Sequence, residues 1–239
     1  MKAVVAGATG KPSKPGLFIT GTDTAVGKTY VAAMIVRDLV ASGRSVGVYK
    51  PVASGCRREG ERLLSDDALA LWQAAGQPGA LDAVCPQRFA APLAPHLAAR
   101  AESRYVDAKL LRTGLDFWLD RCDIVVVEGA GGLISPVSEE EYVADLAFDF
   151  GWPLVVVTPN RLGTIHQTLA TLVVATTFRE GLGMAGIVLN QPSAAPLDES
   201  SASNYDELCR RCVPPVLANV AWQASEFDPA LDWWKLAIG

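Results

Sequence analysis

One short stretch constrains the fold of this chain more than any other: residues 21–29, which read GTDTAVGKT. An apolar run at residues 17–19 precedes it, and a helix-like segment at residues 29–41 follows it. A strand, a glycine-containing loop and then a helix is the context in which such a loop binds phosphate. The backbone N–H groups of the loop and the positive N-terminus of the helix point at an anion. Lys28 adds a mobile positive charge, and the Thr29 hydroxyl can ligate Mg²⁺.

The match to the usual pattern G-x-x-x-x-G-K-[ST] is partial. Thr22 stands at the first glycine position, and Gly21 comes one residue early. An ordinary strand-to-helix turn that happens to contain Gly-Lys-Thr is the alternative, but the flanking elements favour the phosphate loop. Residues 7–11, GATGK, look similar, yet Pro12 stands where Ser or Thr is needed and no helical pattern follows. We therefore discount that second stretch.

Length and composition narrow the class of protein. The chain has 239 residues, half of them hydrophobic, which suits one large α/β domain with a full core. We expect a loosely ordered leader at residues 1–15 and a single domain at residues 16–239. The net charge of −5 argues against a nucleic-acid partner, and no apolar run approaches the ~20 residues that span a membrane. Five cysteines without a secretory signal indicate reduced thiols in the cytoplasm.

Apolar runs alternate with helical patterns along the rest of the chain. Strands are expected at residues 46–49, 123–127, 153–158, 185–189 and 216–220. Helices are expected from residue 65 and at residues 107–120, 142–150, 164–180, 203–212 and 229–236. Residues 56–64 read as a charged loop, residues 192–201 as a polar loop, and residues 80–101 have no clean period. The alternation predicts a mostly parallel sheet with helices on both faces, of the phosphate-loop NTPase type.

Polar residues follow the ends of several of these strands. Besides the phosphate loop, these are Lys50, Ser54, Glu128 and Asn190. In open parallel sheets, ligands bind outside the carboxyl ends of the strands. The sequence therefore predicts one site at that edge.

Magnesium that is bound with nucleotide phosphates needs a hydroxyl and one or two carboxylates. Thr29, Asp67 and Glu128 are the candidates. A helix N-cap is the alternative role for Asp67, and Asp66 is its competitor as a ligand. Glu128 could instead be a solvated acid at a strand end, but the glycine-rich turn that follows it favours a functional role.

Lys50 is a second lysine at a strand end. Sequential strands usually neighbour one another, which would set Lys50 across a bound phosphate from Lys28 as a clamp on the transferred group. An ordinary surface lysine is the alternative. Asn190 could read an adenine edge or could simply end a strand, and His96 is more often structural than catalytic.

Four segments, in this order and spacing, resemble the dethiobiotin synthase family: GTDTAVGKT at 21–29, KPVASG at 50–55, DALAL at 67–71 and EGAGG at 128–132. The resemblance runs from about residue 16 to beyond residue 222, and the pairing of the first two segments is its most specific part.

The resemblance implies an ATP- and Mg²⁺-dependent ligase of biotin synthesis. Its substrate would be 7,8-diaminopelargonate (7,8-diaminononanoate), of which one amine captures CO₂ as a carbamate. ATP would phosphorylate the carbamate, and the second amine would close the ureido ring and release ADP and phosphate. A carbamate is a poor electrophile, so phosphorylation supplies the leaving group that the ring closure needs. The family also implies a homodimer.

Carried over residue by residue, the resemblance gives catalytic roles to Lys50, Lys28 and Thr24. It implies that Thr29, Asp67 and Glu128 bind the metal. Substrate contacts would come from Ser54 and, at the start of a helix near the dimer interface, from Gly163, Thr164 and Ile165. The implied ATP contacts are Ala25, Val26, Gly27, Lys28, Thr29, Tyr30, Asp67, Glu128, Gly129, Ala130, Gly131, Asn190, Gln191, Ala221, Trp222 and Gln223.

The chain departs from the family pattern at several positions. Ala25 stands where an acid is common, and Gln191 replaces an acid after Asn190, so base selection would be looser. His166-Gln167 replaces Asn-His beside the expected carboxylate site, and Ala221 replaces a proline. None of these departures touches the phosphate, metal or Lys50 positions.

Two other enzyme classes share this kind of core. Amide-forming synthetases such as the cobyrinic acid synthases carry an added glutaminase domain, for which we find no nucleophilic-cysteine context. Partitioning-type switch ATPases carry a signature lysine early in the phosphate loop, where this chain has Asp23. Phosphate release that depends on both a diamine and bicarbonate would separate a synthetase from a switch.

Overall fold

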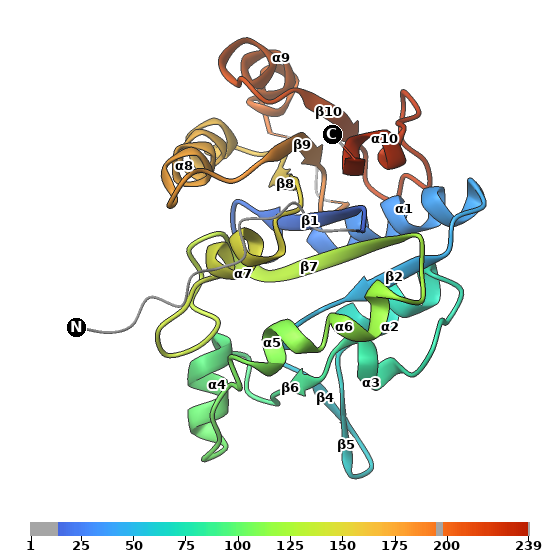
Figure 1. Cartoon of the computed structure of the whole chain (residues 1–239). Helices are drawn as coiled ribbons and strands as arrows, with labels where there is room; N and C mark the ends of the chain where they lie inside the picture. The colour runs from blue at the N-terminus through green and yellow to red at the C-terminus, as the bar shows by residue number, and fades with distance from the viewer. Residues whose placement is uncertain (1–13, 195–197, 239) are drawn as a thin grey trace.

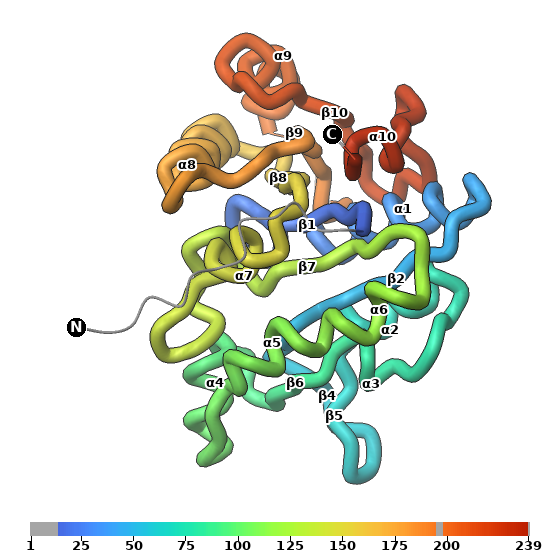
Figure 2. Tube along the Cα trace, viewed as in Figure 1, coloured from blue at the N-terminus to red at the C-terminus, as the bar shows by residue number. Residues whose placement is uncertain are grey.

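The central sheet of the protein has six strands, all parallel. A computed structural model describes residues 14–194 and 198–238. The stretch at residues 7–11 and most of the leader expected at residues 1–15 lie outside the described residues. The strand order is β10-β9-β8-β1-β7-β2, with β1 in the middle (Figures 1 and 2). The strands are β1 (Gly16–Gly21), β2 (Val46–Tyr49), β7 (Ile124–Gly132), β8 (Leu154–Pro159), β9 (Met184–Asn190) and β10 (Val216–Val220).

Helices flank this sheet on both faces, as the alternating pattern predicts. The chain crosses from β1 to β2 in one direction and from β7 to β8, β9 and β10 in the other. Right-handed crossovers therefore place α1 on one face and α7, α8 and α9 on the opposite face. The long helices are α1 (Lys28–Ala41), α2 (Asp66–Ala74), α7 (Val143–Phe150), α8 (Thr164–Thr177) and α9 (Ser201–Arg211).

The predicted neighbour of β1 is wrong. We expected β2 beside β1, but β7 lies between them and pairs with both. The apolar side chains of β7 from Ile124 to Val127 are fully buried, as a central strand covered on both faces requires. In this register Tyr49 pairs with Val127, so the residues that follow them, Lys50 and Glu128, lie side by side.

The segment expected as one helix at residues 107–120 is two short helices, α5 (Leu110–Thr113) and α6 (Asp116–Leu119). The buried Tyr49 hydroxyl donates to the carbonyls of Leu110 and Leu111 at 3.1 and 3.0 Å. At the junction of the two helices, the Leu115 N–H bonds to the Arg112 carbonyl and not to that of Leu111. Tyr49 packs closely at this junction, because a Cβ at Gly114 would come within 2.4 Å of its hydroxyl.

Three other segments differ from expectation. Residues 56–64 form a hairpin of β4 (Arg57–Glu59) and β5 (Arg62–Leu64) rather than a loop. The stretch 80–101 holds α3 (Leu81–Val84), β6 (Gln87–Arg88) and α4 (Pro95–Ala101), with β6 paired to β3 (Val52–Ala53). The last helix, α10 (Trp233–Ile238), begins only after Asp232, whose carboxylate accepts the Lys235 N–H at 2.9 Å.

Among the described residues, no helix has both the length and the apolar character needed to cross a bilayer.

Candidate active site

The phosphate loop lies where the sequence predicts it, between β1 and α1. Gly27 has a φ of 90°, and a Cβ at this position would come within 2.1 Å of the Asn190 amide nitrogen, so only glycine fits. The Lys28 ammonium folds back over the loop and donates to the Asp23 carbonyl at 2.9 Å. Burial, and then the charge of Lys50, lowers the pKa of Lys28 to about 8. The loop therefore holds a buried cation to which no carboxylate of the described residues is bonded.

Four side chains meet beside this loop. The Lys50 ammonium donates to Glu128 Oε1 at 2.6 Å and to the Gly129 carbonyl at 3.2 Å, and it pairs with Asp67 Oδ2 at 2.9 Å. The Thr29 hydroxyl donates to the same Glu128 Oε1 at 2.8 Å. Lys50 and Glu128 are almost fully buried, whereas the Asp67 side chain is 47% exposed. Residues from four parts of the sequence thus form one charged cluster.

The electrostatics of this cluster follow from burial and pairing. Burial opposes the charge of Lys50, but Glu128 and Asp67 outweigh it and raise the pKa of Lys50 above its ordinary value. The charge of Lys50 lowers the pKa of Asp67. Burial raises the pKa of Glu128, against the opposite pull of Lys50. Lys50 therefore stays protonated across the physiological range and stabilises both carboxylates as anions.

The structure separates Asp67 from its competitor. Asp66 points away from the cluster and pairs with Arg57 at 2.9 Å. Nor is Asp67 the N-cap of α2, because the Ser65 hydroxyl accepts the Ala68 N–H at 3.2 Å. The N-cap alternative for Asp67 is therefore wrong.

One cavity of about 900 Å³ collects most of the residues that the sequence singled out. Its walls are the phosphate loop, the segment after β2 and the end of β7. The predicted residues that line it are Thr24, Ala25, Gly27, Lys28, Thr29, Tyr30, Lys50, Ser54, Asp67, Glu128, Ala130 and Gly131. Gly129 contributes its carbonyl to Lys50, as described above.

Sequence reasoning missed two walls of this cavity. Residues 92–95, which end on the first residue of α4, form an apolar side, and Ser135 and Pro136 form another part of the lining. The prolines at 92 and 95 were the only signal for the first wall. No signal pointed to Ser135, whose hydroxyl accepts the Gly132 N–H at 2.8 Å. His96 lies on α4, outside this lining.

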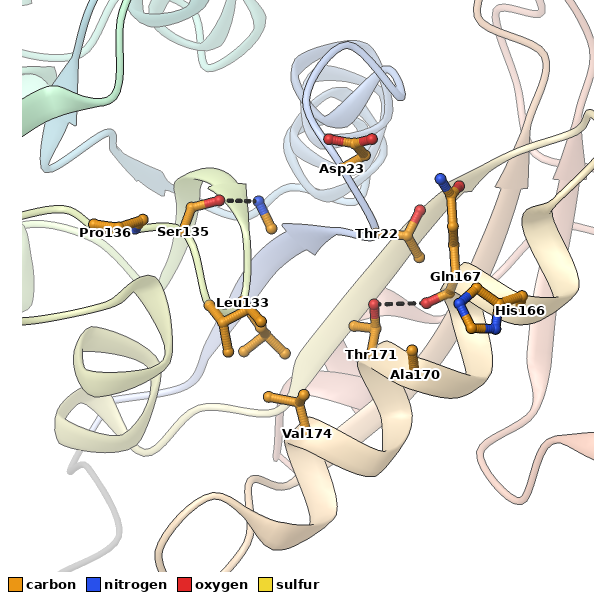
Figure 3. Close-up of a pocket in the computed structure, with 12 residues that line it drawn as sticks. Thr22, Asp23, Leu133, Ser135, Pro136, His166, Gln167, Ala170, Thr171 and Val174 are labelled. Atoms are coloured by element: carbon orange, nitrogen blue, oxygen red, sulfur yellow. Dashed lines mark hydrogen bonds between the residues drawn. The ribbon is translucent and has the colours of Figure 1, made fainter.

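A smaller pocket of about 390 Å³ adjoins the cavity at Ser135 and Pro136 (Figure 3). Asp23 and Ser135 stand on one side of it, and His166 and Gln167 reach in from α8 on the other. Two of the positions at which the chain departs from the family pattern therefore face this pocket.

The predicted base-contacting residues lie at the ends of β9 and β10, outside the cavity lining. The Asn190 amide nitrogen donates to the Val26 carbonyl at 2.9 Å, and its Oδ1 is buried without a hydrogen-bond partner among the described residues. The Trp222 N–H donates to Gln191 Oε1 at 3.4 Å. The Tyr30 hydroxyl donates to the Ala224 carbonyl, which ties the segment holding Ala221 and Gln223 to α1. The bond to Val26 thus fixes the orientation of Asn190 Oδ1, which is the kind of acceptor that can recognise an exocyclic amine.

The expected substrate contacts at the start of α8 are only partly available. Gly163 is the N-cap of α8 with a φ of 95°, and Ile165 follows in its first turn. The Thr164 side chain is fully buried and bonds to the Thr158 hydroxyl at 2.7 Å, so it faces the sheet. Its backbone N–H donates to Arg161. Thr164 therefore supports this helix end rather than presenting a hydroxyl to a ligand.

Comparison with known proteins shows which family this chain belongs to. A family model described as an AAA domain matches residues 15–228. The ATP-dependent dethiobiotin synthetase BioD of Rhodopirellula baltica is 45% identical over 215 residues, which are 85% of this chain and 82% of that protein. The enzyme of the same name from Anaeromyxobacter dehalogenans is 44% identical over 87% of this chain and 90% of its own length. The one from Pseudomonas paraeruginosa is 38% identical over 94% of this chain and 99% of its own length.

Solved structures show the fold alone. A putative plasmid partition protein from Borrelia burgdorferi, bound to AMPPNP, aligns with a TM-score of 0.56 at 10% identity, over 95% of this chain and 96% of that one. A ParA family ATPase from Chlorobium tepidum aligns with a TM-score of 0.50 at 14% identity, over 87% and 83% of the two chains. Both confirm a phosphate-loop NTPase type of sheet and say nothing of the reaction.

Proposed function

Because this chain belongs to the family of ATP-dependent dethiobiotin synthetases, we propose that its cavity closes the ureido ring of dethiobiotin from 7,8-diaminononanoate, CO₂ and ATP. The enzyme is an ATP-dependent ligase of biotin biosynthesis. The observation that carries the detailed proposal is the meeting of Lys50, Glu128, Asp67 and Thr29 beside the phosphate loop in one cavity.

The nucleotide binds with its phosphates in the loop and its base at Asn190. Backbone N–H groups of the loop and the N-terminus of α1 favour the phosphate charge, and Lys28 adds a cation. Asn190 Oδ1 accepts from the exocyclic amine of adenine, since its amide nitrogen already bonds to Val26. Guanine carries an oxygen at that ring position, so the same geometry disfavours GTP.

The residues present fit a magnesium ion. Thr29, Asp67 and Glu128 offer the hard oxygen ligands that Mg²⁺ prefers. The Thr29 proton goes to Glu128, which leaves the lone pairs of its oxygen available. Glu128 Oε2 is buried and has no hydrogen-bond partner among the described residues, so its lone pairs are also unused. When bound, the ion would neutralise charge on the nucleotide phosphates.

The chain's own cations serve the transfer. One amine of the substrate forms an N–C bond to CO₂ and loses a proton, which gives the carbamate. A carbamate oxygen then displaces ADP from the γ-phosphorus, and the second amine attacks the carbonyl carbon and expels phosphate. Lys28 and Lys50 place positive charge where the phosphoryl group and the carbamate meet, and negative charge concentrates there as the phosphoryl group moves.

Two groups of residues are proposed to orient the substrate, one at its amines and one at its carboxylate. Ser54 lines the same cavity as Lys50 and is proposed to face the amines. The N-terminus of α8, at Gly163 and Ile165, is proposed to hold the substrate carboxylate of a partner subunit in a homodimer. The homodimer, the use of CO₂ and the cytoplasmic location remain predictions.

A coupled assay tests the function. Dethiobiotin should form only when the diamino acid, bicarbonate and MgATP are all present, with one phosphate released for each product molecule. Phosphate release that ignores the diamine and bicarbonate would contradict a synthetase and favour a switch ATPase.

A further inference from the structure

The Lys50 ammonium lies between the two carboxylates that are proposed to bind the metal. It lies 2.6 Å from Glu128 Oε1 and 2.9 Å from Asp67 Oδ2, the two carboxylates assigned to magnesium. The ammonium also donates a hydrogen bond to the Gly129 carbonyl. Only 3% of Lys50 and 1% of Glu128 are exposed, so water screens this contact poorly.

The charge count of the cluster makes Lys50 necessary without a metal. Two carboxylates meet one bonded ammonium, and removing that partner would leave an uncompensated buried charge at Glu128. Lys28 does not replace it, because its ammonium bonds to the Asp23 carbonyl and not to either carboxylate. While Lys50 is bonded to these carboxylates, its positive charge would repel a divalent cation that approaches the same oxygens.

We propose that Lys50 is an exchangeable counter-cation, which neutralises Glu128 and Asp67 in the nucleotide-free enzyme and keeps Mg²⁺ from binding there alone. This inference rests on the proposed metal and phosphate roles. The γ-phosphate and the carbamate offer Lys50 other anionic partners, so substrates would draw it from the carboxylates as the metal arrives with ATP. Metal binding thereby depends on the presence of nucleotide, and the clamp lysine reaches the phosphoryl group only when the metal can replace it.

The pair Lys50 and Lys28 provides a matched control. Both ammonium groups are buried at the same site, and replacing either with Met removes one positive charge and keeps an apolar stem. Only Lys50 touches the carboxylates. A difference between the two variants therefore reports contact, not net charge.

The test measures Mn²⁺, used as a spectroscopic substitute for Mg²⁺, by the loss of its free electron paramagnetic resonance signal on binding to the full chain without nucleotide. Lys50→Met should bind Mn²⁺ at least about tenfold more tightly than wild type, which corresponds to ~1.4 kcal/mol. Lys28→Met should stay within about threefold of wild type. Adding Glu128→Gln to Lys50→Met should abolish the gain.

Three results would overturn the inference. Tight Mn²⁺ binding by nucleotide-free wild type would do so, and this observation needs no variant to fold. Equal affinity of Lys50→Met and wild type would do so, with thermal melting confirming that the variant is folded. An equal gain in Lys28→Met would assign the effect to net charge.

A separate arm tests the proposed function. With a non-hydrolysable ATP analogue present, Glu128→Gln should weaken Mn²⁺ binding in an otherwise wild-type chain. If it does not, the assignment of Glu128 as a metal ligand fails. That outcome is distinct from a failure of Lys50→Met to gain affinity without nucleotide.

Discussion

Replacing Thr158 with Val removes the hydroxyl that joins α8 to the phosphate loop. Thr158 is the last residue but one of β8, and its oxygen accepts from the hydroxyls of Thr168 at 2.9 Å and Thr22 at 3.3 Å. Because both lone pairs are taken, its own proton must go to Thr164, 2.7 Å away. The variant therefore deletes three hydrogen bonds at once while keeping the shape of the side chain.

The size of the effect follows from burial. Thr164 and Thr168 are fully buried, so each loses a hydroxyl partner that water cannot replace. An unsatisfied buried polar group costs about 1–3 kcal/mol, which suggests a loss of roughly 2–4 kcal/mol in the free energy of unfolding. For a chain of this size, each kcal/mol corresponds to about 2–4 °C, so Tm should fall by roughly 5–15 °C.

Thr20 offers a matched comparison on the neighbouring strand. It is fully buried, like Thr158, but its hydroxyl has no hydrogen-bond partner among the described residues. Thr20→Val should therefore raise the free energy of unfolding by about 1 kcal/mol, since it removes an unsatisfied buried group. Urea and thermal unfolding of both variants and of Thr158→Ser, which keeps the hydroxyl, would measure these effects.

The reasoning would be refuted if Thr20→Val and Thr158→Val destabilised the protein equally. Burial of a threonine at this sheet, and not the bonding of its hydroxyl, would then decide the cost. A further readout follows from the position of Thr164 at the start of α8. Thr158→Val should raise KM for the diamino acid more than KM for ATP, whereas Thr176→Val, at the far end of the same helix, should leave both unchanged.

The remaining predictions concern the chemistry and the base. Lys50→Met should still bind ATP but form dethiobiotin about 10²–10³-fold more slowly in a single turnover at saturating substrates. The reason is that the transition state loses a preorganised cation. If the variant keeps the wild-type single-turnover rate, Lys50 has no role in the mechanism. Lys28 has a pKa of about 8, so its charge is complete below that pH and is lost above it. The kcat/KM for ATP should therefore fall as pH rises through about 8, and Lys28→Arg, whose guanidinium does not titrate there, should abolish the fall if Lys28 is its source. Asn190→Ala should reduce the preference for ATP over GTP in competition binding, and an unchanged preference would move base recognition elsewhere in the site.

The sequence by itself determined the features that depend on local pattern. The phosphate loop, its preceding strand and α1 follow from glycine, lysine and apolar spacing within about 25 residues. The parallel sheet follows from the alternation of buried strands and amphipathic helices. The order of motifs also identified the family, and the relatives confirm it.

Only the tertiary structure decided what meets across the sheet. The insertion of β7 between β1 and β2 sets Glu128 beside Lys50, whereas neighbour rules alone place β2 next to β1. The choice of Asp67 over Asp66 depends on which carboxylate faces into the cavity, and consecutive residues on a helix point in different directions. Likewise, the two short helices found in place of the helix expected at residues 107–120 pack against the hydroxyl of Tyr49, more than 60 residues earlier in the chain. Local propensity contains no information about such partners, because they are brought together only when the whole core packs.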